Sequence, residues 1–512
     1  MKRYWFLALF ALLCLAAASV WMGGLNQDEG WYLYAANLVA EGQLPYRDFQ
    51  FTQAPLLPEI YSHFTALWKG GGLLAARLFT LLLGLGSVAL FAAAAARMAR
   101  PGRRGATALV TVFLLGVNLF HLYYLTIPKT YALASLFVAG GFLLLTLALP
   151  PRRRGENPVA GGRALPLLFF AGLLLAFAAG TRISLGALLA AVGCVLLARR
   201  RWTELAAFSL GGFVGLGFTF APYLLDPAAR DGFLAAQKYH AARGGFAAVF
   251  TIGSCSRLVR WYLPLFILLG LSAPALPKLF KSAPSGNPDA PVGDEDGFYN
   301  SQAMLIITYL VAFAAVFIVQ LLAPFPYEDY QVPVMGLLAI VAAVSATGAL
   351  KFNPLLLTLG LCYATAFGSP LLEKWTTNGQ DRFWSLKKER CELADLRKAA
   401  RIVEQLDPGG TQLLTQDLYL AIETGRKVPS GLEMGPFSIL TDAEWRALLE
   451  TTSCPVAALS GYTFAIEPPV CCERSVSQQL EYWGLLKRRY VMATKLPDFG
   501  QNATPLLILK LK

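Results

Sequence analysis

The stretch Asn26-Gln27-Asp28-Glu29-Gly30-Trp31-Tyr32 ends the first apolar run of the chain and opens a polar-containing segment that extends to Trp68. It sets two carboxylates at the end of a hydrophobic run, where a membrane-spanning chain would meet water. One interpretation is structural: Asn26 caps a helix, with Glu29 as its partner in a capping box and with acidic residues favoured by the helix dipole. The other is that the carboxylates carry out chemistry at the lipid–water boundary. These residues alone do not decide between the two.

The composition is that of a polytopic membrane protein. The 512 residues are 56% hydrophobic and only 15% charged, and the mean hydropathy is +0.50, which no soluble single domain would show. The net charge of +12 does not indicate nucleic-acid binding, because the basic residues gather in short clusters between apolar runs, as in cytoplasmic loops. These clusters are Arg97, Arg100, Arg103 and Arg104; Arg152, Arg153 and Arg154; and Arg199, Arg200 and Arg201.

Apolar runs long enough to cross a bilayer recur along the first three quarters of the chain. The N-terminal run to about Gly24 resembles a signal peptide, but it is long enough to span, and we predict a first helix with a cytoplasmic N-terminus. Further spans, each near the ~20 residues that a bilayer requires, are predicted at 73–96, 106–125, 131–149, 165–181, 183–198, 206–225, 258–277, 303–323, 332–350 and 354–372. With about eleven helices, alternation puts the Arg clusters in the cytoplasm, in agreement with the positive-inside rule.

The remainder, 373–512, is not membrane-like and, after an odd number of spans, is predicted to lie outside the cytoplasm. Leu393, Leu396, Ala400, Val403 and Leu406 recur at helical spacing, and Thr441-Asp442-Ala443-Glu444 is a capping box that opens a second helix. Residues 412–415 and 506–511 predict short strands. We therefore expect a transmembrane domain at 1–372, with a first outer loop at 25–72, and a small extracytoplasmic α/β domain at 373–512.

Four cysteines of this C-terminal part predict at least one disulfide, because free thiols rarely persist in an oxidising compartment. They are Cys391, Cys454, Cys471 and Cys472, with Cys255 as a fifth candidate. Four cysteines allow three connectivities, and the sequence does not choose between them.

Three cations are placed near the outer ends of predicted spans: Arg77, Lys129 and Arg182. Within an apolar helix a cation costs roughly 2.5 to 3.5 kcal/mol on insertion scales, so such residues tend to be functional. Any one of them is more often a side chain that reaches toward lipid headgroups. Three of them on the side of the carboxylate-bearing loop predict a site for an anionic phosphate.

Together these residues resemble the GT-C glycosyltransferases, in the family 39-like branch that includes protein O-mannosyltransferases and the aminoarabinose transferase of lipid A. The resemblance covers about residues 1–372. Its motifs are Asp28-Glu29 after the first span, Tyr46-Arg47-Asp48-Phe49 and Ala54-Pro55-Leu56 in the same loop, Ala76-Arg77-Leu78 in the second span, and Thr181-Arg182.

Two departures from the family pattern concern the second outer loop and a late span. Lys129 stands where many relatives have an acidic residue after a proline, and Glu328-Asp329-Tyr330-Gln331-Val332-Pro333 stands where a His before a Tyr is frequent. They leave acceptor recognition and a divalent metal open. The residues themselves predict no cofactor, since no metal-spaced His/Cys motif and no glycine-rich phosphate loop is found.

The resemblance implies sugar transfer from a polyprenyl-phosphate donor to an acceptor glycan, lipid or protein, at the outer face of a bacterial-type cell membrane. It implies that Asp28 serves the acceptor, with Glu29 and Asp48 as further catalytic candidates. An anionic leaving group needs cations, which Arg77, Lys129 and Arg182 can supply, and the acceptor hydroxyl needs a base, so direct displacement would invert configuration. The residues predicted to contact donor or acceptor from the loops are Arg47, Glu328, Asp329 and Tyr330.

Two other function classes stay open on the sequence. A lipid-linked polysaccharide polymerase or ligase would need the same donor chemistry. A multi-span transporter usually places ionisable residues or broken helices near the bilayer midplane, whereas the ionisable residues of this chain lie near the ends of the spans. No nucleic-acid partner is expected.

Overall fold

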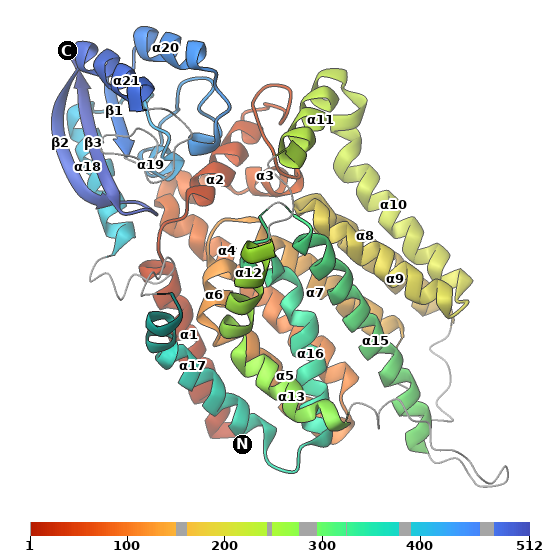
Figure 1. The fold of residues 1–512 in the computed structure, drawn as a ribbon. Helices are drawn as coiled ribbons and strands as arrows, with labels where there is room; N and C mark the ends of the chain where they lie inside the picture. Colours follow the sequence, from red (N-terminus) through yellow and green to blue (C-terminus); the bar gives the residue numbers. More distant parts are fainter. Residues whose placement is uncertain are drawn as a thin grey trace.

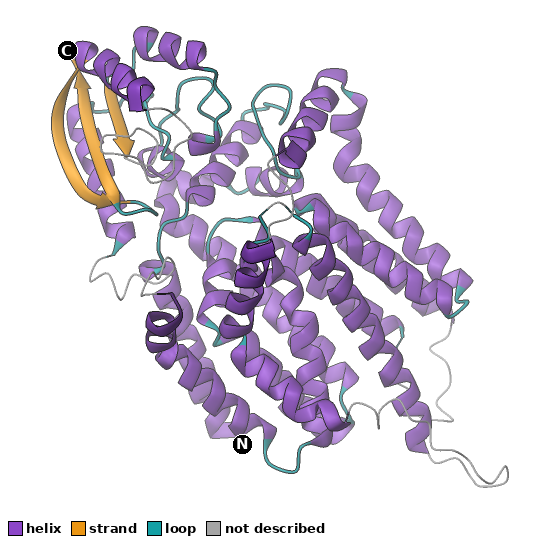
Figure 2. Ribbon diagram, in the orientation of Figure 1, coloured by secondary structure: helices purple, strands orange, loops and turns teal. Residues whose placement is uncertain are grey.

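The computed structural model describes residues 2–149, 161–242, 248–275, 294–323, 325–377, 391–460 and 476–512. A bundle of long helices carries a small domain with a three-stranded sheet at one end, and the N-terminus lies at the other end (Figure 1). Helix predominates throughout the bundle, and strands occur only in the C-terminal part of the described chain (Figure 2).

The helices of the bundle and its upper loops are α1 (Lys2–Met22), α2 (Gln27–Ala40), α3 (Leu56–Ser62), α4 (Thr65–Met98), α5 (Arg104–Gly116), α6 (Leu119–Thr126), α7 (Thr130–Ala148), α8 (Gly161–Thr181), α9 (Ala187–Ala198), α10 (Trp202–Leu225), α11 (Pro227–Ala242), α12 (Ala248–Trp261), α13 (Leu263–Ser272), α15 (Asp294–Leu321), α16 (Val332–Ala349) and α17 (Pro354–Thr377). The C-terminal domain consists of α18 (Glu392–Leu406), α19 (Leu418–Thr424), α20 (Asp442–Thr451), β1 (Val456–Ser460), α21 (Val476–Arg489), β2 (Tyr490–Phe499) and β3 (Thr504–Leu511).

Among the described residues, six helices are long and apolar enough to cross a membrane: α4, α7, α8, α10, α15 and α16. Two further pairs, α5 with α6 and α12 with α13, are bent by 75° and 80°, and counting each as one span raises the number to eight. The other three predicted spans fall on shorter apolar segments of α1, α9 and α17. The prediction of about eleven spans therefore locates the apolar segments, but the count is not confirmed.

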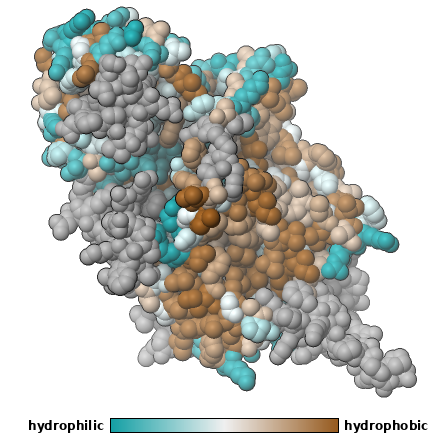
Figure 3. Space-filling model, in the orientation of Figure 1, coloured by the Kyte–Doolittle hydropathy of each residue, from teal (hydrophilic) through white to brown (hydrophobic). Residues whose placement is uncertain are grey.

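The surface of the bundle agrees with an integral membrane protein. Hydrophobic residues cover the long helices, and hydrophilic residues gather on the C-terminal domain and at the ends of the bundle (Figure 3). Exposed apolar side chains are frequent on α10, where Phe213 and Phe218 are both more than 70% exposed. Exposed residues of this kind would be costly in water, and they fit a lipid-facing helix.

The Arg-rich turn between α4 and α5 and the C-terminal domain lie at opposite ends of α4. Near its start, Leu73 N donates a hydrogen bond to Glu423 Oε2 of α19 at 2.8 Å. Beyond its end, Arg103 donates to the carbonyl oxygen of Thr347, in the last turn of α16. Long helices that cross the bundle in this way separate the basic turn from the carboxylate-bearing loop, as the alternation of spans predicts.

The C-terminal sheet is antiparallel, with the strand order β1-β3-β2. The predicted strand at 506–511 is confirmed as part of β3, whereas 412–415 forms only isolated bridges, Gln412 with Lys427 and Leu414 with Ala457. The helix predicted from the spacing of Leu393 to Leu406 is confirmed as α18. The capping box predicted at Thr441 is confirmed as well: Thr441 N donates a hydrogen bond to Glu444 Oε2 at 2.7 Å. The strand prediction at 412–415 is wrong because each bridge is a single pair and no ladder follows it.

Helix α2 is buried between the bundle and the C-terminal domain. It packs in one core with α19 and the sheet, and Leu33, Tyr419 and Leu420 are all fully buried. Further along the loop, α3 ends at Ser62 and α4 begins at Thr65. Helix α2 therefore belongs to the interior of the protein, because the C-terminal domain covers it.

The structure describes only two of the four cysteines of the predicted disulfide, so that prediction stays untested. Cys391 and Cys454 carry free thiols, and so does Cys255. Cys471 and Cys472 lie outside the described residues. Among the described residues, no disulfide joins Cys391 to Cys454.

Candidate active site at the start of helix α2

The first turn of α2 is set by a capping box. Asp28 N donates a hydrogen bond to Asn26 Oδ1 at 3.0 Å, and Asn26 N donates to Glu29 Oε1 at 2.9 Å. The side chain of Asn26 replaces the missing helical acceptor for the first free N–H groups. The structural interpretation of the opening stretch is thus confirmed for Asn26 and Glu29, and the carboxylate of Asp28 takes no part in the cap.

Glu29 also forms a bidentate ion pair with Arg77 of α4, and both side chains are fully buried. Arg77 Nε donates to Glu29 Oε2 at 2.7 Å, and Nη2 donates to Oε1 at 2.6 Å. The remaining guanidinium N–H groups donate to the carbonyl oxygens of Val20, Gly23 and Gly24. All five donors of an arginine are therefore engaged. In this conformation neither side chain can reach a substrate, so the geometry does not support Arg77 as a phosphate ligand or Glu29 as a catalytic group.

Asp28 points instead into a cluster made by three segments that are far apart in the sequence. Lys129 Nζ lies 2.8 Å from Asp28 Oδ2 and 3.2 Å from Asp329 Oδ2. Tyr131 OH donates a hydrogen bond to the same Asp329 oxygen at 2.7 Å. The side chain of Asp28 is 20% exposed, against 11% for Lys129 and 9% for Asp329. Asp28 is thus the most accessible of the three charged groups.

Lys129 holds the two carboxylates together from the position before the first residue of α7. Burial lowers the pKa of its ammonium, but Asp28, Tyr131 and Asp329 more than offset this, and the pKa lies well above its usual value. The rings of Tyr131 and Tyr124 lie 5.0 and 5.6 Å from Nζ, within the range of a cation–π contact. The lysine is therefore held in its charged form between two anions and two aromatic faces.

Arg182 also contacts the ring of Tyr131, together with that of Tyr330. Its guanidinium carbon is 4.0 Å from the ring centre of Tyr330 and 5.1 Å from that of Tyr131. Within the parts of the chain that the structure describes, no carboxylate forms an ion pair with Arg182. Its N–H donors are therefore available for an anion, whereas those of Arg77 are not.

Arg47 and Asp48 form a separate group on the outer loop. Arg47 Nη2 lies 2.9 Å from Asp48 Oδ2, and Nη1 lies 3.2 Å from Asp226 Oδ2, just before α11. Hydrogen bonds from Arg47 and from Leu44 N lower the pKa of Asp48 to about 2. Neither residue contacts the cluster of Asp28 and Lys129 in the described structure, so this pair holds the loop against α11.

Glu328 is adjacent to Asp329 in a short 3-10 helix, Glu328–Gln331, which precedes α16. It pairs with Arg257 of α12 at 3.0 Å, so α12 is tied to the segment that carries Asp329. Tyr32 of α2 is buried on the near side of the cluster. Burial raises the pKa of Tyr32, Asp28 raises it further, and Lys129 and Arg182 lower it in part, which shows that Tyr32 lies within the field of all three.

Sequence reasoning named Asp28, Lys129, Arg182, Asp329 and Tyr330, which the structure brings together. It missed Tyr131, Tyr32 and Arg257. The first two lie within four positions of residues that were named, in Lys129-Thr130-Tyr131 and in Asp28-Glu29-Gly30-Trp31-Tyr32. An aromatic residue near a charged one is too frequent in membrane proteins to be recognised as a site without a structure.

A divalent metal does not fit the residues present. The described residues contain no group of three His, Cys, Asp or Glu side chains that could hold a metal ion. The two carboxylates that converge in the cluster share the ammonium of Lys129, which occupies the place that a cation would take between them.

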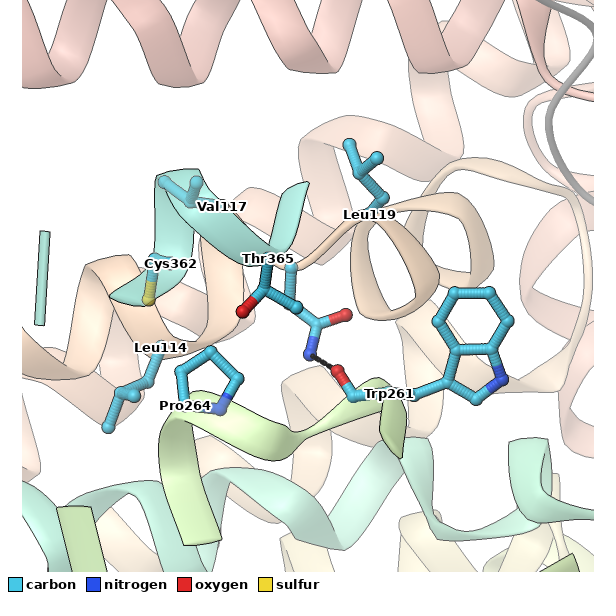
Figure 4. A pocket seen from close by; sticks show the side chains of 8 residues that line it. Leu114, Val117, Leu119, Trp261, Pro264, Cys362 and Thr365 are labelled. Carbon is cyan, nitrogen blue, oxygen red and sulfur yellow. Dashed lines mark hydrogen bonds between the residues drawn. The ribbon is translucent and has the colours of Figure 1, made fainter. Parts of the chain in front are cut away.

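A small pocket lies elsewhere, where the bent pairs α5–α6 and α12–α13 meet (Figure 4). Asn118 Nδ2 donates to the carbonyl oxygen of Trp261 at 2.9 Å, and His121 Nδ1 lies 2.7 Å from Tyr262 OH. These contacts join the two bends and satisfy polar groups that a broken helix leaves without partners. None of the cluster residues lines this pocket, and we do not assign it to the chemistry.

Comparison with solved structures identifies the architecture. ArnT from Cupriavidus metallidurans in the apo state matches with a TM-score of 0.58 and 15% sequence identity, over 99% of this chain and 98% of that chain. ArnT, the lipid A aminoarabinose transferase, is a GT-C superfamily member. The chain has the GT-C fold. The structure of ArnT bound to undecaprenyl phosphate matches with a TM-score of 0.56 and 14% identity, over the same shares of the two chains.

The structural match to ArnT extends past residue 372 into the C-terminal domain, beyond the part that the sequence motifs cover. The Archaeoglobus fulgidus oligosaccharyltransferase in the apo form gives a TM-score of 0.47 and 10% identity, over 89% of this chain and 70% of that chain. No family model matches the sequence, and no curated protein matches it.

Proposed function

We propose that this GT-C chain transfers a sugar from a polyprenyl-phosphate donor to an acceptor hydroxyl, at the cluster of Asp28, Lys129 and Asp329. The observation that carries the proposal is the pairing of Asp28 with Lys129 at 2.8 Å in a site that also holds Asp329 and Arg182. Arg182 forms no ion pair with any carboxylate of the described residues. The fold supports the donor class, because one of the solved ArnT structures is bound to undecaprenyl phosphate.

Asp28 is the proposed general base. An acceptor hydroxyl must lose its proton as it attacks the sugar, and a carboxylate within hydrogen-bond distance can take it. Asp28 is more exposed than Asp329, whose Oδ2 is engaged by both Tyr131 and Lys129. We therefore assign Asp329 to holding Lys129 and Tyr131 in place. The acceptor would approach the side of Asp28 that is open to solvent.

Arg182 is the proposed ligand of the donor phosphate, with Lys129 as its neighbour. As the bond between the anomeric carbon and the phosphate oxygen breaks, negative charge grows on the phosphate, and fixed cations stabilise it. Attack from the side of Asp28 with departure toward Arg182 is a direct displacement, which inverts the configuration at the anomeric carbon. Arg77 is assigned to the buried pair with Glu29, and Arg47 and Asp48 are assigned to holding the loop.

The transporter alternative receives less support from this arrangement. Transporters bind their substrate near the bilayer midplane, between discontinuous helices. The charged residues of this cluster lie instead at the start of α2, just before α7 and just before α16, and the C-terminal domain packs against α2. A polymerase or ligase that uses a lipid-linked donor would have the same chemistry and a glycan as acceptor. We propose further that this end of the bundle faces the outer side of the membrane.

The test uses purified protein, labelled undecaprenyl-phosphate sugars and measurement of carrier-dependent transfer or hydrolysis. Asp28→Asn should lower turnover by about 10² to 10⁴ with donor binding intact, because the amide keeps the shape but cannot accept the proton. Asp48→Asn should have an intermediate effect through the loop. Asp231→Asn, an exposed carboxylate on α11, is the matched control and should behave as wild type. Near-wild-type turnover by folded Asp28→Asn protein would overturn the proposal.

A further inference from the structure

The residue that precedes Asp28 is held by the C-terminal domain. Gln27 Nε2 donates hydrogen bonds to Asp417 Oδ1 at 2.8 Å and to Tyr419 OH at 3.1 Å. Tyr419 OH in turn donates to Asp417 Oδ1 at 3.0 Å, so the three side chains form a closed triangle. Gln27 N donates to Gln501 Oε1 at 2.9 Å. Gln27, Asp417 and Tyr419 are all buried, so water does not compete for these hydrogen bonds.

The residue that follows Asp28 is held by the bundle. Glu29 pairs with Arg77, and the guanidinium binds three carbonyl groups at the end of α1. The first turn of α2 is therefore fixed on both sides of Asp28, by one contact set from the C-terminal domain and by another from α1 and α4. Glu392 of α18 adds a further link, because its Oε2 accepts a hydrogen bond from Leu25 N at 2.7 Å.

Gly30 lets the C-terminal domain come close enough to make the triangle. A Cβ atom at this position would overlap Tyr419 N and the carbonyl carbon of Leu418. Helix α2 thus meets the start of α19 backbone against backbone, with no side chain between them. This contact brings Asp417 and Tyr419 within hydrogen-bond distance of Gln27, and only glycine permits it.

From this arrangement we infer that Asp417, Tyr419 and Gln27 are positioning residues, through which the C-terminal domain sets the carboxylate of Asp28 against Lys129. The inference rests on the proposed role of Asp28 as the base. It makes the C-terminal domain part of the catalytic apparatus. The side chain of Asp28 forms no hydrogen bond or ion pair with that domain among the described residues, and it receives its orientation through the backbone of Gln27. Orientation of this kind matters because a shift of about 1 Å in a reacting group can cost roughly 10²-fold in rate.

The experiment compares kcat and donor KM for Gln27→Ala and Asp417→Ala with those of wild type. We expect kcat to fall by about 10- to 100-fold, with donor KM changed less than about threefold, because Arg182 is untouched. Asp417→Asn should restore most of kcat, since its Oδ1 still accepts from Gln27 Nε2. Lys427→Met is the matched control: it removes an exposed ion pair between the same domain and the far end of α2, with Glu41, and should leave kcat and KM unchanged.

Two further measurements keep the outcome interpretable. Gln501→Ala removes only the acceptor of Gln27 N from a surface turn, so it tests positioning even if Asp417→Ala does not fold. It should lower kcat several-fold. Asp28→Asn is assayed in parallel: an active Asp28→Asn enzyme would refute the proposed function. An inactive one, together with wild-type kcat for folded Gln27→Ala and Gln501→Ala, would refute the positioning role alone.

Discussion

The ion pair of Glu29 and Arg77 is fully buried, and every N–H group of the arginine has an acceptor. This buried pair shows why a cationic side chain near the end of a membrane span need not bind a substrate. The pair has the cationic residue type and the location that a phosphate site would need, yet it is closed to solvent. Its role is to tie α2, α1 and α4 together directly beside Asp28.

Arg77→Met should therefore act on stability rather than on donor binding. Removal of one partner of a buried pair leaves an uncompensated charge and typically costs about 3–5 kcal/mol. We expect a marked loss of folded protein, and Glu29→Gln should show a smaller loss because the amide keeps one acceptor. Thermal unfolding in detergent and donor affinity measure the two effects separately. If Arg77→Met has wild-type stability but binds the donor more weakly, Arg77 is a ligand of the donor phosphate and the structural role is wrong.

Arg182→Ala should weaken donor binding and leave the fold intact. A hydrogen bond to a charged group contributes about 1.5–3 kcal/mol, which corresponds to a roughly 10- to 150-fold increase in the dissociation constant. Arg230→Ala, which removes a half-exposed cation from α11, should leave that constant unchanged. The measurement is the binding of a labelled undecaprenyl-phosphate sugar to the purified variants. Equal affinities for Arg182→Ala and wild type would show that Arg182 does not bind the donor phosphate.

Stability should depend on pH through Asp417. Burial raises the pKa of this carboxyl, although hydrogen bonds from Gln27 and Tyr419 lower it in part. The folded protein therefore binds the proton more tightly than the unfolded chain does. The resulting contribution to the free energy of unfolding is complete below the usual aspartate pKa of about 3.9 and is lost as the pH rises through the folded-state pKa.

Asp417→Asn removes this titration. The Tm of the variant relative to that of wild type should therefore increase as the pH is raised from about 4 into the neutral range. Thermal unfolding at several pH values measures it, with Lys427→Met as the control. If Asp417→Asn and wild type show parallel curves, the carboxyl does not titrate in this range.

Membrane topology gives an independent prediction. Reporter fusions after Arg104, Arg154 and Arg201 should report the cytoplasm, because clustered basic residues are retained there. Fusions after Trp68 and within 380–512 should report the outer side. A cytoplasmic C-terminal domain would place the cluster of Asp28 and Lys129 on the wrong face for a donor presented outside the cell.

The elements that the sequence predicts well are those with local causes. Apolar runs locate the helices, and the capping boxes at Asn26 and Thr441 follow from spacing alone. The convergence of Asp28, Lys129 and Arg182 could be expected, because alternating spans bring their outer ends together. The spacing of residues in the sequence does not show which group a charged side chain binds. Arg77 and Arg182 both lie near the outer ends of predicted spans, yet Arg77 pairs with Glu29 and Arg182 stacks on Tyr330.

The bends and the interdomain contacts have no local signal. The break between α5 and α6 is held by Asn118 against Trp261, a residue of another bent pair. Helix α2 is buried because a domain from the other end of the chain covers it. Neither the break nor the burial of α2 can be predicted from neighbouring residues in the sequence, because each depends on a contact between segments more than a hundred residues apart.

The hydrogen bond between Gln27 and Asp417 joins residues separated by 390 positions, and this separation has a consequence for biosynthesis. At ~5–20 residues per second, a ribosome needs between about 20 and 80 s to proceed from the first residue to the second. For that time α2 has been made, but the partner that covers it has not. A chain released early, before Asp417, would carry Lys129 and Asp329 on completed helices and still lack the contact that orients its base.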